Sequence, residues 1–304
     1  MSIAVFTQTA VLFAIIVLGY VAGKTKVMSL EGNKSLSTMV NSIANPCSVL
    51  YAALCSQRSF TNLQILQLLG IAIGMFVFLI LAAQLVPKML GVKKEESGQY
   101  KYMMIFSNIS YMGIPVISAV LGESATISAA IFIMVFYCFL YTYGIFLLRD
   151  KKETFKLGAL INPTLIASLT GIVCYFFNVR ASGILANLLQ SVRNITTPCA
   201  MLIVGATLST LPLKAVFSNW RLYIVSLLKL LILPGAVYLC LRPYLGDNIV
   251  FKALIVMMSM PIAANFTTLC AQYDRDQQLS ASAIFITTAL SLVTIPLIAG
   301  LLTS

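Results

Sequence analysis

The sequence predicts an all-α membrane protein that crosses the bilayer ten times. The chain of 304 residues is 60% hydrophobic and only 10% charged, whereas a soluble domain carries about 25% charged residues. Apolar runs of roughly 20 residues, the length that crosses the hydrocarbon core as a helix, follow one another along the chain. An internal repeat divides these runs into two groups of five.

The first apolar run begins almost at the first residue. Residues 3–23 are too long for the apolar part of a signal peptide and have no basic leading segment, so they are expected to form the first span. The ten expected spans are 3–23, 36–56, 64–86, 100–121, 125–147, 157–178, 183–209, 221–241, 249–272 and 279–302.

Loops and interruptions separate the first five spans. Charged loops at 24–34 and 88–99 follow the first and third spans, and a polar stretch at 57–63 follows the second. The fourth span contains the helix-breaking sequence FSNISYMGIPV at 106–116. The fifth ends at 149–156, which is expected to be a short cytoplasmic linker.

The second five spans follow the same order. The sixth begins after the linker, and polar turns near Arg180 and Lys214 bound the seventh. The ninth contains a second interruption, SMPIAANFTT at 259–268, and a polar loop around Arg275 precedes the tenth. The chain therefore divides into residues 1–148 and residues 157–304.

The basic residues are unevenly divided between the loops. Fourteen of the 20 Lys and Arg residues lie on one side of the expected helices, five lie on the other, and Lys229 lies inside the eighth span. Short cytoplasmic loops are rich in Lys and Arg, so both termini are expected on the extracytoplasmic side of the inner or plasma membrane. The net charge of +11 is spread over loops, which favours the lipid bilayer rather than nucleic acid as a partner.

Three pairs of segments recur at an offset of about 152 residues. Because each repeat has an odd number of spans, its second copy enters the membrane from the opposite side. Inverted repeats of this kind are common in transporters. The matching segments are Gly19 with Gly171, Pro46-Cys47 with Pro198-Cys199, and 128–133 with 280–286.

The breaks in the fourth and ninth spans lie at equivalent repeat positions. Irregular backbone is tolerated inside a membrane only where it is buried in protein or lines a water-filled cavity. We therefore expect the two breaks to cross, so that half-helix N-termini, with their free N–H groups and partial positive charge, can hold a small anion. A pair of ordinary proline kinks is the alternative. The donors are expected around Gly113 and from Ala263 to Asn265.

The titratable residues limit the chemistry. All nine Asp and Glu residues lie in loops or at span ends, whereas cation carriers usually place a carboxylate near the midplane. A cation substrate is therefore not expected, although sodium held by carbonyl and hydroxyl oxygens stays open. Histidine is absent and the seven cysteines have no paired spacing. No catalytic residue, metal or cofactor is expected, because an enzyme needs a nucleophile with a base or paired acids.

Two cations lie deep within the expected spans. Arg193 could bind a carboxylate through two hydrogen bonds or extend to the outer interface. Lys229 is expected to extend to the interface or to bond backbone carbonyls.

Small and polar residues in the spans can serve either helix packing or a binding site. Asn41 and Asn45 share a helix face. Amides on such a face either join neighbouring helices or line a site. Thr197 is a further candidate for lining the site. Gly70 and Gly74 form a GxxxG pattern, which predicts close helix packing.

Four segments together resemble the auxin efflux carrier family. They are SN followed by MGIP in the fourth span, INPTLIASLTGI, TTPCAMLIVGATLS and MPIAANF. The resemblance covers essentially the whole chain and implies a fold like that of bile-acid symporters and sodium/proton antiporters. Spans 1, 2, 6 and 7 would form a scaffold domain, and spans 3–5 and 8–10 a transport domain that moves like an elevator. Relatives also imply a homodimer.

The resemblance further implies a substrate site at the crossing. Asn108 would hydrogen-bond a carboxylate and Pro261 would be the crossover proline. Ser107 stands where relatives have a proline, so the fourth-span break would depend on Gly113 and Pro115. The candidate substrate-binding residues are Ser107, Asn108, Tyr111, Met112, Gly113, Pro115, Pro261, Ala263 and Asn265, with Asn41, Asn45, Arg193 and Thr197 on the scaffold side.

The predicted function is therefore transport of a small mono- or dicarboxylate, such as malate, malonate or an auxin-like acid. A sodium-coupled symporter of the bile-acid type is an alternative, and sodium dependence of uptake would identify it. A channel would conduct faster than a carrier cycle, and a receptor would bind ligand without flux.

Overall fold

The computed structural model describes residues 3–55, 61–122, 125–149, 163–210, 213–246 and 248–303. These residues form helices, and their one pairing of extended backbone is an isolated antiparallel bridge between Ser107 and Ile262. The predicted linker at 149–156 lies outside the described residues except for Arg149.

The helices follow the expected runs closely, and α11 coincides with the expected span 183–209. The first part of the chain contains α1 (Ile3–Lys24), α2 (Leu30–Met39), η1 (Val40–Ala44), α3 (Asn45–Cys55), α4 (Asn62–Ala83), α5 (Val86–Met89), α6 (Ser97–Ile105), η2 (Ile109–Gly113), α7 (Ile114–Leu121), α8 (Thr126–Phe139), η4 (Leu140–Gly144) and α9 (Ile145–Leu148). The second part contains α10 (Pro163–Phe176), α11 (Gly183–Ser209), α12 (Leu213–Ser218), α13 (Trp220–Leu227), η6 (Leu228–Ile232), α14 (Leu233–Leu245), α15 (Ile249–Met258), α16 (Phe266–Gln272) and α17 (Gln277–Thr303). The η elements are π-helical turns.

Several helices are long and apolar enough to cross a membrane. Four described stretches meet both conditions: Asn62–Met89, Ile131–Leu148, Trp220–Leu245 and Gln277–Leu302. Shorter apolar helices occur at Phe13–Lys24, Pro163–Phe176 and Ile249–Met258. These helices indicate a polytopic membrane protein, whereas the count of ten spans and their inverted arrangement stay predictions.

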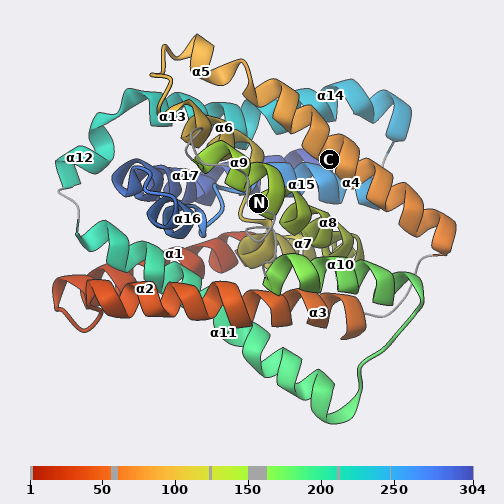
Figure 1. The fold of residues 1–304 in the computed structure, drawn as a ribbon. Helices are drawn as coiled ribbons and strands as arrows, with labels where there is room; N and C mark the ends of the chain where they lie inside the picture. The colour runs from red at the N-terminus through yellow and green to blue at the C-terminus, as the bar shows by residue number, and fades with distance from the viewer. Residues whose placement is uncertain are drawn as a thin grey trace.

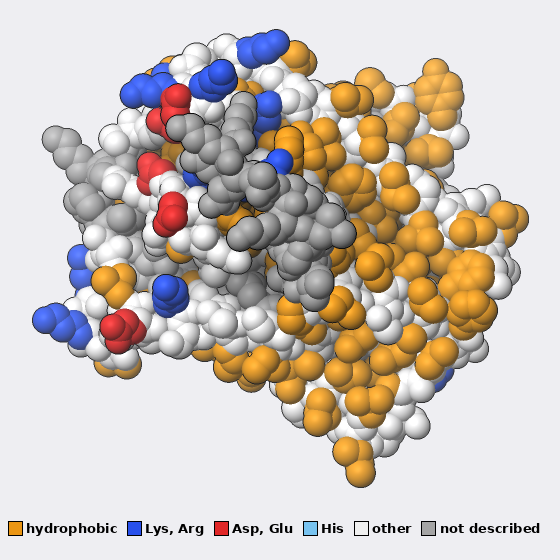
Figure 2. All heavy atoms as spheres, viewed as in Figure 1, with side chains coloured by type: hydrophobic (Ala, Val, Ile, Leu, Met, Phe, Trp, Pro, Cys, Tyr) orange, Lys and Arg blue, Asp and Glu red, His pale blue; other side chains and the backbone are white. Residues whose placement is uncertain are grey.

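The surface of α4 shows how these helices meet their surroundings. Leu68 and Phe76 are buried, yet Leu66, Ile73 and Leu81 on the other faces are exposed. A helix that is apolar on all sides suits a membrane, because lipid can cover the face that protein does not. Figure 2 shows the same division for the molecule, with hydrophobic side chains over the right side of this face and charged ones toward the left.

Two helix pairs lie together along the lower side of Figure 1: α1 with α11, and α3 with α10. A Cβ atom at Gly19 would overlap the carbonyl oxygen of Leu202, and one at Gly205 would overlap that of Ile16. Only glycine allows two backbones to approach so closely. These four helices belong to the predicted scaffold, but the division into two domains stays a prediction.

The GxxxG prediction for Gly70 and Gly74 is wrong. No atom lies within 4 Å of a Cβ built at either glycine. The neighbouring helix α14 stands away from α4 here, and Gly74 borders an apolar groove between them. The pattern permits close packing, but packing also requires a partner helix at that level.

Candidate functional site at two crossed helix breaks

Two interrupted helices meet through their backbones. The N–H of Asn108 donates to the carbonyl oxygen of Pro261 at 2.7 Å, and the N–H of Ala263 donates to that of Phe106 at 3.1 Å. These bonds flank the bridge between Ser107 and Ile262. The breaks of the fourth and ninth expected spans therefore lie against each other, as the sequence predicts.

The first break lies within the predicted stretch 106–116, but at its start rather than at Gly113 and Pro115. Phe106, the C-cap of α6, has extended backbone angles, and helix resumes at Ile109. Gly113 instead closes the π-helical turn η2, and Pro115 lies in α7. The proline cannot donate to the preceding turn, and the wider π-helical turn just before it accommodates that loss.

Two of the N–H groups that the sequence predicts as ligand donors, those of Gly113 and Ala263, are not available to a ligand. The N–H of Ala263 is taken by Phe106, so it is not free for a ligand. Gly113 is the fifth residue of the helix that starts at Ile109, and only the first four N–H groups of a helix lack an internal partner. The N–H groups of Asn108 and Ile109 are taken by the carbonyl oxygens of Pro261 and Ser107, so any free donors of this half-helix lie between Ile109 and Met112.

Asn108 is the most unusual polar residue at the crossing. Its side chain is 2% exposed, and neither its oxygen nor its nitrogen has a hydrogen-bond partner among the described residues. Most buried polar groups are paired, because leaving one unpaired costs about 1–3 kcal/mol. An amide retained at this cost is available to a ligand that can accept a hydrogen bond.

Asn265 lies on the second break, where it precedes α16. The hydroxyl of Tyr102 donates to its side-chain oxygen at 3.3 Å, and the Tyr102 ring stacks on Phe266 with centroids 4.3 Å apart. This bond takes the amide oxygen and leaves the amide nitrogen as the donor.

A small cavity separates Asn265 from the predicted scaffold. It has a volume of 10 Å³, which is room for about one water molecule. Across the same boundary, the hydroxyl of Thr268 donates to that of Ser37 at 3.2 Å. The cavity is lined by Ser37, Val40, Ala200, Ile203, Ala264, Asn265 and Thr268.

Lys229 approaches the first break from η6. It is 1% exposed and donates to the carbonyl oxygen of Met104 at 3.2 Å and to the hydroxyl of Ser107 at 3.0 Å. The expected bond to a carbonyl is confirmed, and the alternative of reaching the interface is wrong. The ammonium lies at the C-terminal end of α6, where unpaired carbonyls carry partial negative charge.

The predicted scaffold residues lie in other surroundings. The guanidinium of Arg193 lies over the ring of Tyr51, 4.7 Å from its centroid, and so joins α11 to α3. Thr197 is half-buried on α11, and Asn45 is fully buried at the start of α3.

The remaining candidates divide into two groups. Met112 is buried within η2, and Pro261 belongs to the bridge. The side chains of Asn41, Tyr111 and Pro115 lie outside the described residues.

Sequence reasoning missed three residues that shape the site. Tyr102 fixes the Asn265 amide, and Thr287 accepts a hydrogen bond from the N–H of Ile262 at 3.3 Å. Ser37 lies four residues before Asn41, so the helical spacing that singled out Asn41 could have found it. No local pattern points to Tyr102 or Thr287, because their partners are distant in sequence.

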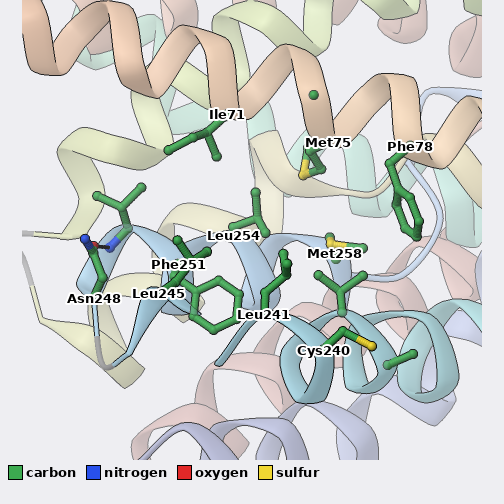
Figure 3. Close-up of a pocket in the computed structure, with 14 residues that line it drawn as sticks. Ile71, Met75, Phe78, Cys240, Leu241, Leu245, Asn248, Phe251, Leu254 and Met258 are labelled. Carbon is green, nitrogen blue, oxygen red and sulfur yellow. Dashed lines mark hydrogen bonds between the residues drawn. The ribbon is translucent and has the colours of Figure 1, made fainter. Parts of the chain in front are cut away.

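The larger groove between α4 and α14 is a poor anion site. It has a volume of 490 Å³, and Ile71, Phe78 and Leu254 are among its apolar lining side chains (Figure 3). Asn248 contributes an amide, but among the described residues no charged side chain lines the groove. Its surface matches hydrocarbon rather than a carboxylate.

Comparisons with known proteins agree with this architecture. A family model described as "Membrane transport protein" matches residues 4–159 and 153–299. An uncharacterized transporter from Methanocaldococcus jannaschii is 27% identical over 299 residues, which is 94% of this chain and 95% of the relative. A Rhizobium meliloti protein named "Putative malonate transporter" is 28% identical over 207 residues, or 62% of each chain.

Proposed function

Because the chain belongs to the membrane transport protein family, that of the auxin efflux carriers, we propose that it is a carrier of small organic anions across the inner or plasma membrane. The substrates are mono- or dicarboxylates of the size of malonate or malate. The name of the Rhizobium meliloti relative supports this class.

The observation that carries the proposal is the unpaired amide of Asn108. Its nitrogen is a buried donor with no acceptor among the described residues, and a carboxylate supplies charged acceptors that form stronger hydrogen bonds than neutral ones. The half-helix that starts at Ile109 adds the partial positive charge of its N-terminus. Both features favour an anion, and Asn265 supplies a second amide on the facing break.

The geometry of the cavity supports an alternating-access cycle. A space of 10 Å³ holds about one water molecule, so a dicarboxylate needs the crossing to move away from α2 and α11. The close backbone contacts of Gly19 and Gly205 favour α1 and α11 as a rigid unit. We propose that this unit stays fixed while the crossing and its attached helices move like an elevator.

Ligand binding to the purified protein tests the substrate class. Malonate, malate and the uncharged amide malonamide are added in turn while the melting temperature is followed. A ligand that binds only the folded state raises this temperature, so we expect malonate or malate to raise it and malonamide to leave it unchanged.

Asn108→Ala is expected to abolish the ligand-induced shift. Asn187→Ala, on an exposed face of α11, is the matched control and keeps it. A full shift in the Asn108 variant would reject the site, and no shift with any carboxylate in the unaltered protein would reject the substrate class. Uptake of labelled malonate into liposomes then separates a carrier from a receptor, because a receptor binds without flux.

A further inference from the structure

Lys229 is a buried cation without a neighbouring carboxylate. Its ammonium has two partners among the described residues, the carbonyl oxygen of Met104 and the hydroxyl of Ser107. Among the residues that the structure describes, neither partner of Lys229 is an Asp or a Glu. Burying a charge without its counter-charge is strongly unfavourable, so a cation at this depth indicates a function.

The position of Lys229 relates it directly to Asn108. Ser107, which accepts its hydrogen bond, is the residue before Asn108 and pairs with Ile262 in the bridge. The N–H of Ile109 donates to the carbonyl oxygen of Ser107 at 2.8 Å, so the chain turns at Asn108. Lys229 therefore contacts the residue directly before the unpaired amide of Asn108.

The same contacts occupy the oxygens that a bound sodium ion would need. Sodium coupling without a membrane carboxylate requires carbonyl and hydroxyl oxygens at the breaks. At the first break, the oxygens of Met104 and Ser107 already accept hydrogen bonds from the ammonium. At the first break, the Lys229 side chain thus occupies oxygens that a co-transported cation would need.

We infer that Lys229 is the resident counter-charge of the anion site. It holds the first break in shape through Ser107 and attracts the substrate carboxylate through space, in place of a co-transported sodium ion. Lys229 is a positioning residue, because it acts through the break rather than by touching the substrate. This inference rests on the proposed function and specifies its coupling: anion binding needs no sodium.

The test measures malonate affinity by calorimetry in sodium buffer and in choline buffer. The variants are Lys229→Met, which removes the charge, and Lys229→Arg, which keeps it. Lys252→Met in α15 is the matched control, because it removes a lysine from the same half of the chain away from the break. Chromatography and melting temperature without ligand show whether each variant is folded.

The expected result is equal affinity of the unaltered protein in both buffers. A positive charge beside the break attracts a carboxylate in a protein interior strongly enough for Lys229→Met to weaken malonate binding about 10- to 100-fold. Lys229→Arg should keep most of the affinity, and Lys252→Met all of it. Rescue by arginine identifies the charge, since a role in packing alone would be lost in both variants.

Three results would overturn the inference. If folded Lys229→Met binds malonate as tightly as the unaltered protein, Lys229 is not the counter-charge, and the proposed function stands. If the unaltered protein needs sodium to bind, the inference fails even where the variants do not fold. If the unaltered protein binds neither malonate nor malate in either buffer, the proposed function fails with it.

Discussion

Thr287 holds Ile262 in place at the crossing: the threonine hydroxyl oxygen accepts a hydrogen bond from the isoleucine N–H at 3.3 Å. This N–H lies in the second break, where no helical carbonyl is available to it. Thr287 itself donates to Ala283 one turn back. One side chain of α17 thus connects an unwound segment to an intact helix.

Replacing Thr287 by valine should destabilise the protein. The change keeps the shape but leaves the buried N–H of Ile262 unpaired, at a cost of about 1–3 kcal/mol. Thr294→Val in the same helix is the control, because the Thr294 hydroxyl has no partner among the described residues and its loss should be neutral or stabilising. Unfolding in a denaturant series measures both, and equal losses would contradict the role of Thr287.

Asn108→Leu should separate binding from stability. Leucine removes two buried, unpaired polar atoms, so the free energy of unfolding should stay the same or rise by about 1 kcal/mol. Carboxylate binding should disappear. Melting temperature with and without malonate measures both effects, and a large loss of stability would mean that the amide has a structural partner.

Gly205→Ala should weaken the contact between α1 and α11. The added Cβ would overlap the backbone of Ile16, and overpacking of this kind costs about 1–3 kcal/mol. Gly70→Ala is the matched control, since open space surrounds that position and alanine favours a helix by about 0.5–1 kcal/mol. Melting temperatures of the two variants should therefore move in opposite directions.

A disulfide across the moving boundary should stop transport. The hydroxyl oxygens of Ser37 and Thr268 lie 3.2 Å apart, so cysteines at these positions can be joined. In a chain without its seven native cysteines, oxidation of the Ser37→Cys, Thr268→Cys pair should abolish malonate flux, and a reductant should restore it.

The control disulfide lies within the predicted scaffold. The hydroxyls of Ser48 in α3 and Thr196 in α11 are 3.0 Å apart, and joining them should leave flux intact. If malonate flux is undiminished when positions 37 and 268 are cross-linked, the elevator motion is contradicted. If cross-linking at either pair of positions blocks flux, the scaffold itself must move.

The sequence predicts the helices and the crossing of the breaks well. Apolar length is a local property, so the helices follow the expected runs. Pro261 and the amide of Asn265 mark the second break where it is found, because a proline and a buried amide each have a local cost. Asn108 follows from the same reasoning, and its unpaired amide is the strongest feature of the site.

The rest depends on distant partners. The first break begins at Phe106 because Ala263 and Pro261 pair with the backbone there, and no proline between 106 and 108 signals it. Lys229 is visible as an intramembrane cation, but its acceptor Met104 is 125 residues away. Such contacts exist only once the two halves of the chain have packed together.

The lone charge of Lys229 also has an electrical consequence. Moving one elementary charge across a membrane is worth about 2.3 kcal/mol per 100 mV. A moving unit that holds this lysine is positive when empty and neutral when it holds a monocarboxylate. An inside-negative voltage would then act on the empty unit and draw it toward the cytoplasm, while the loaded unit would cross without feeling the field. The membrane potential would thus drive the return of the empty unit in an export cycle and oppose it in an import cycle.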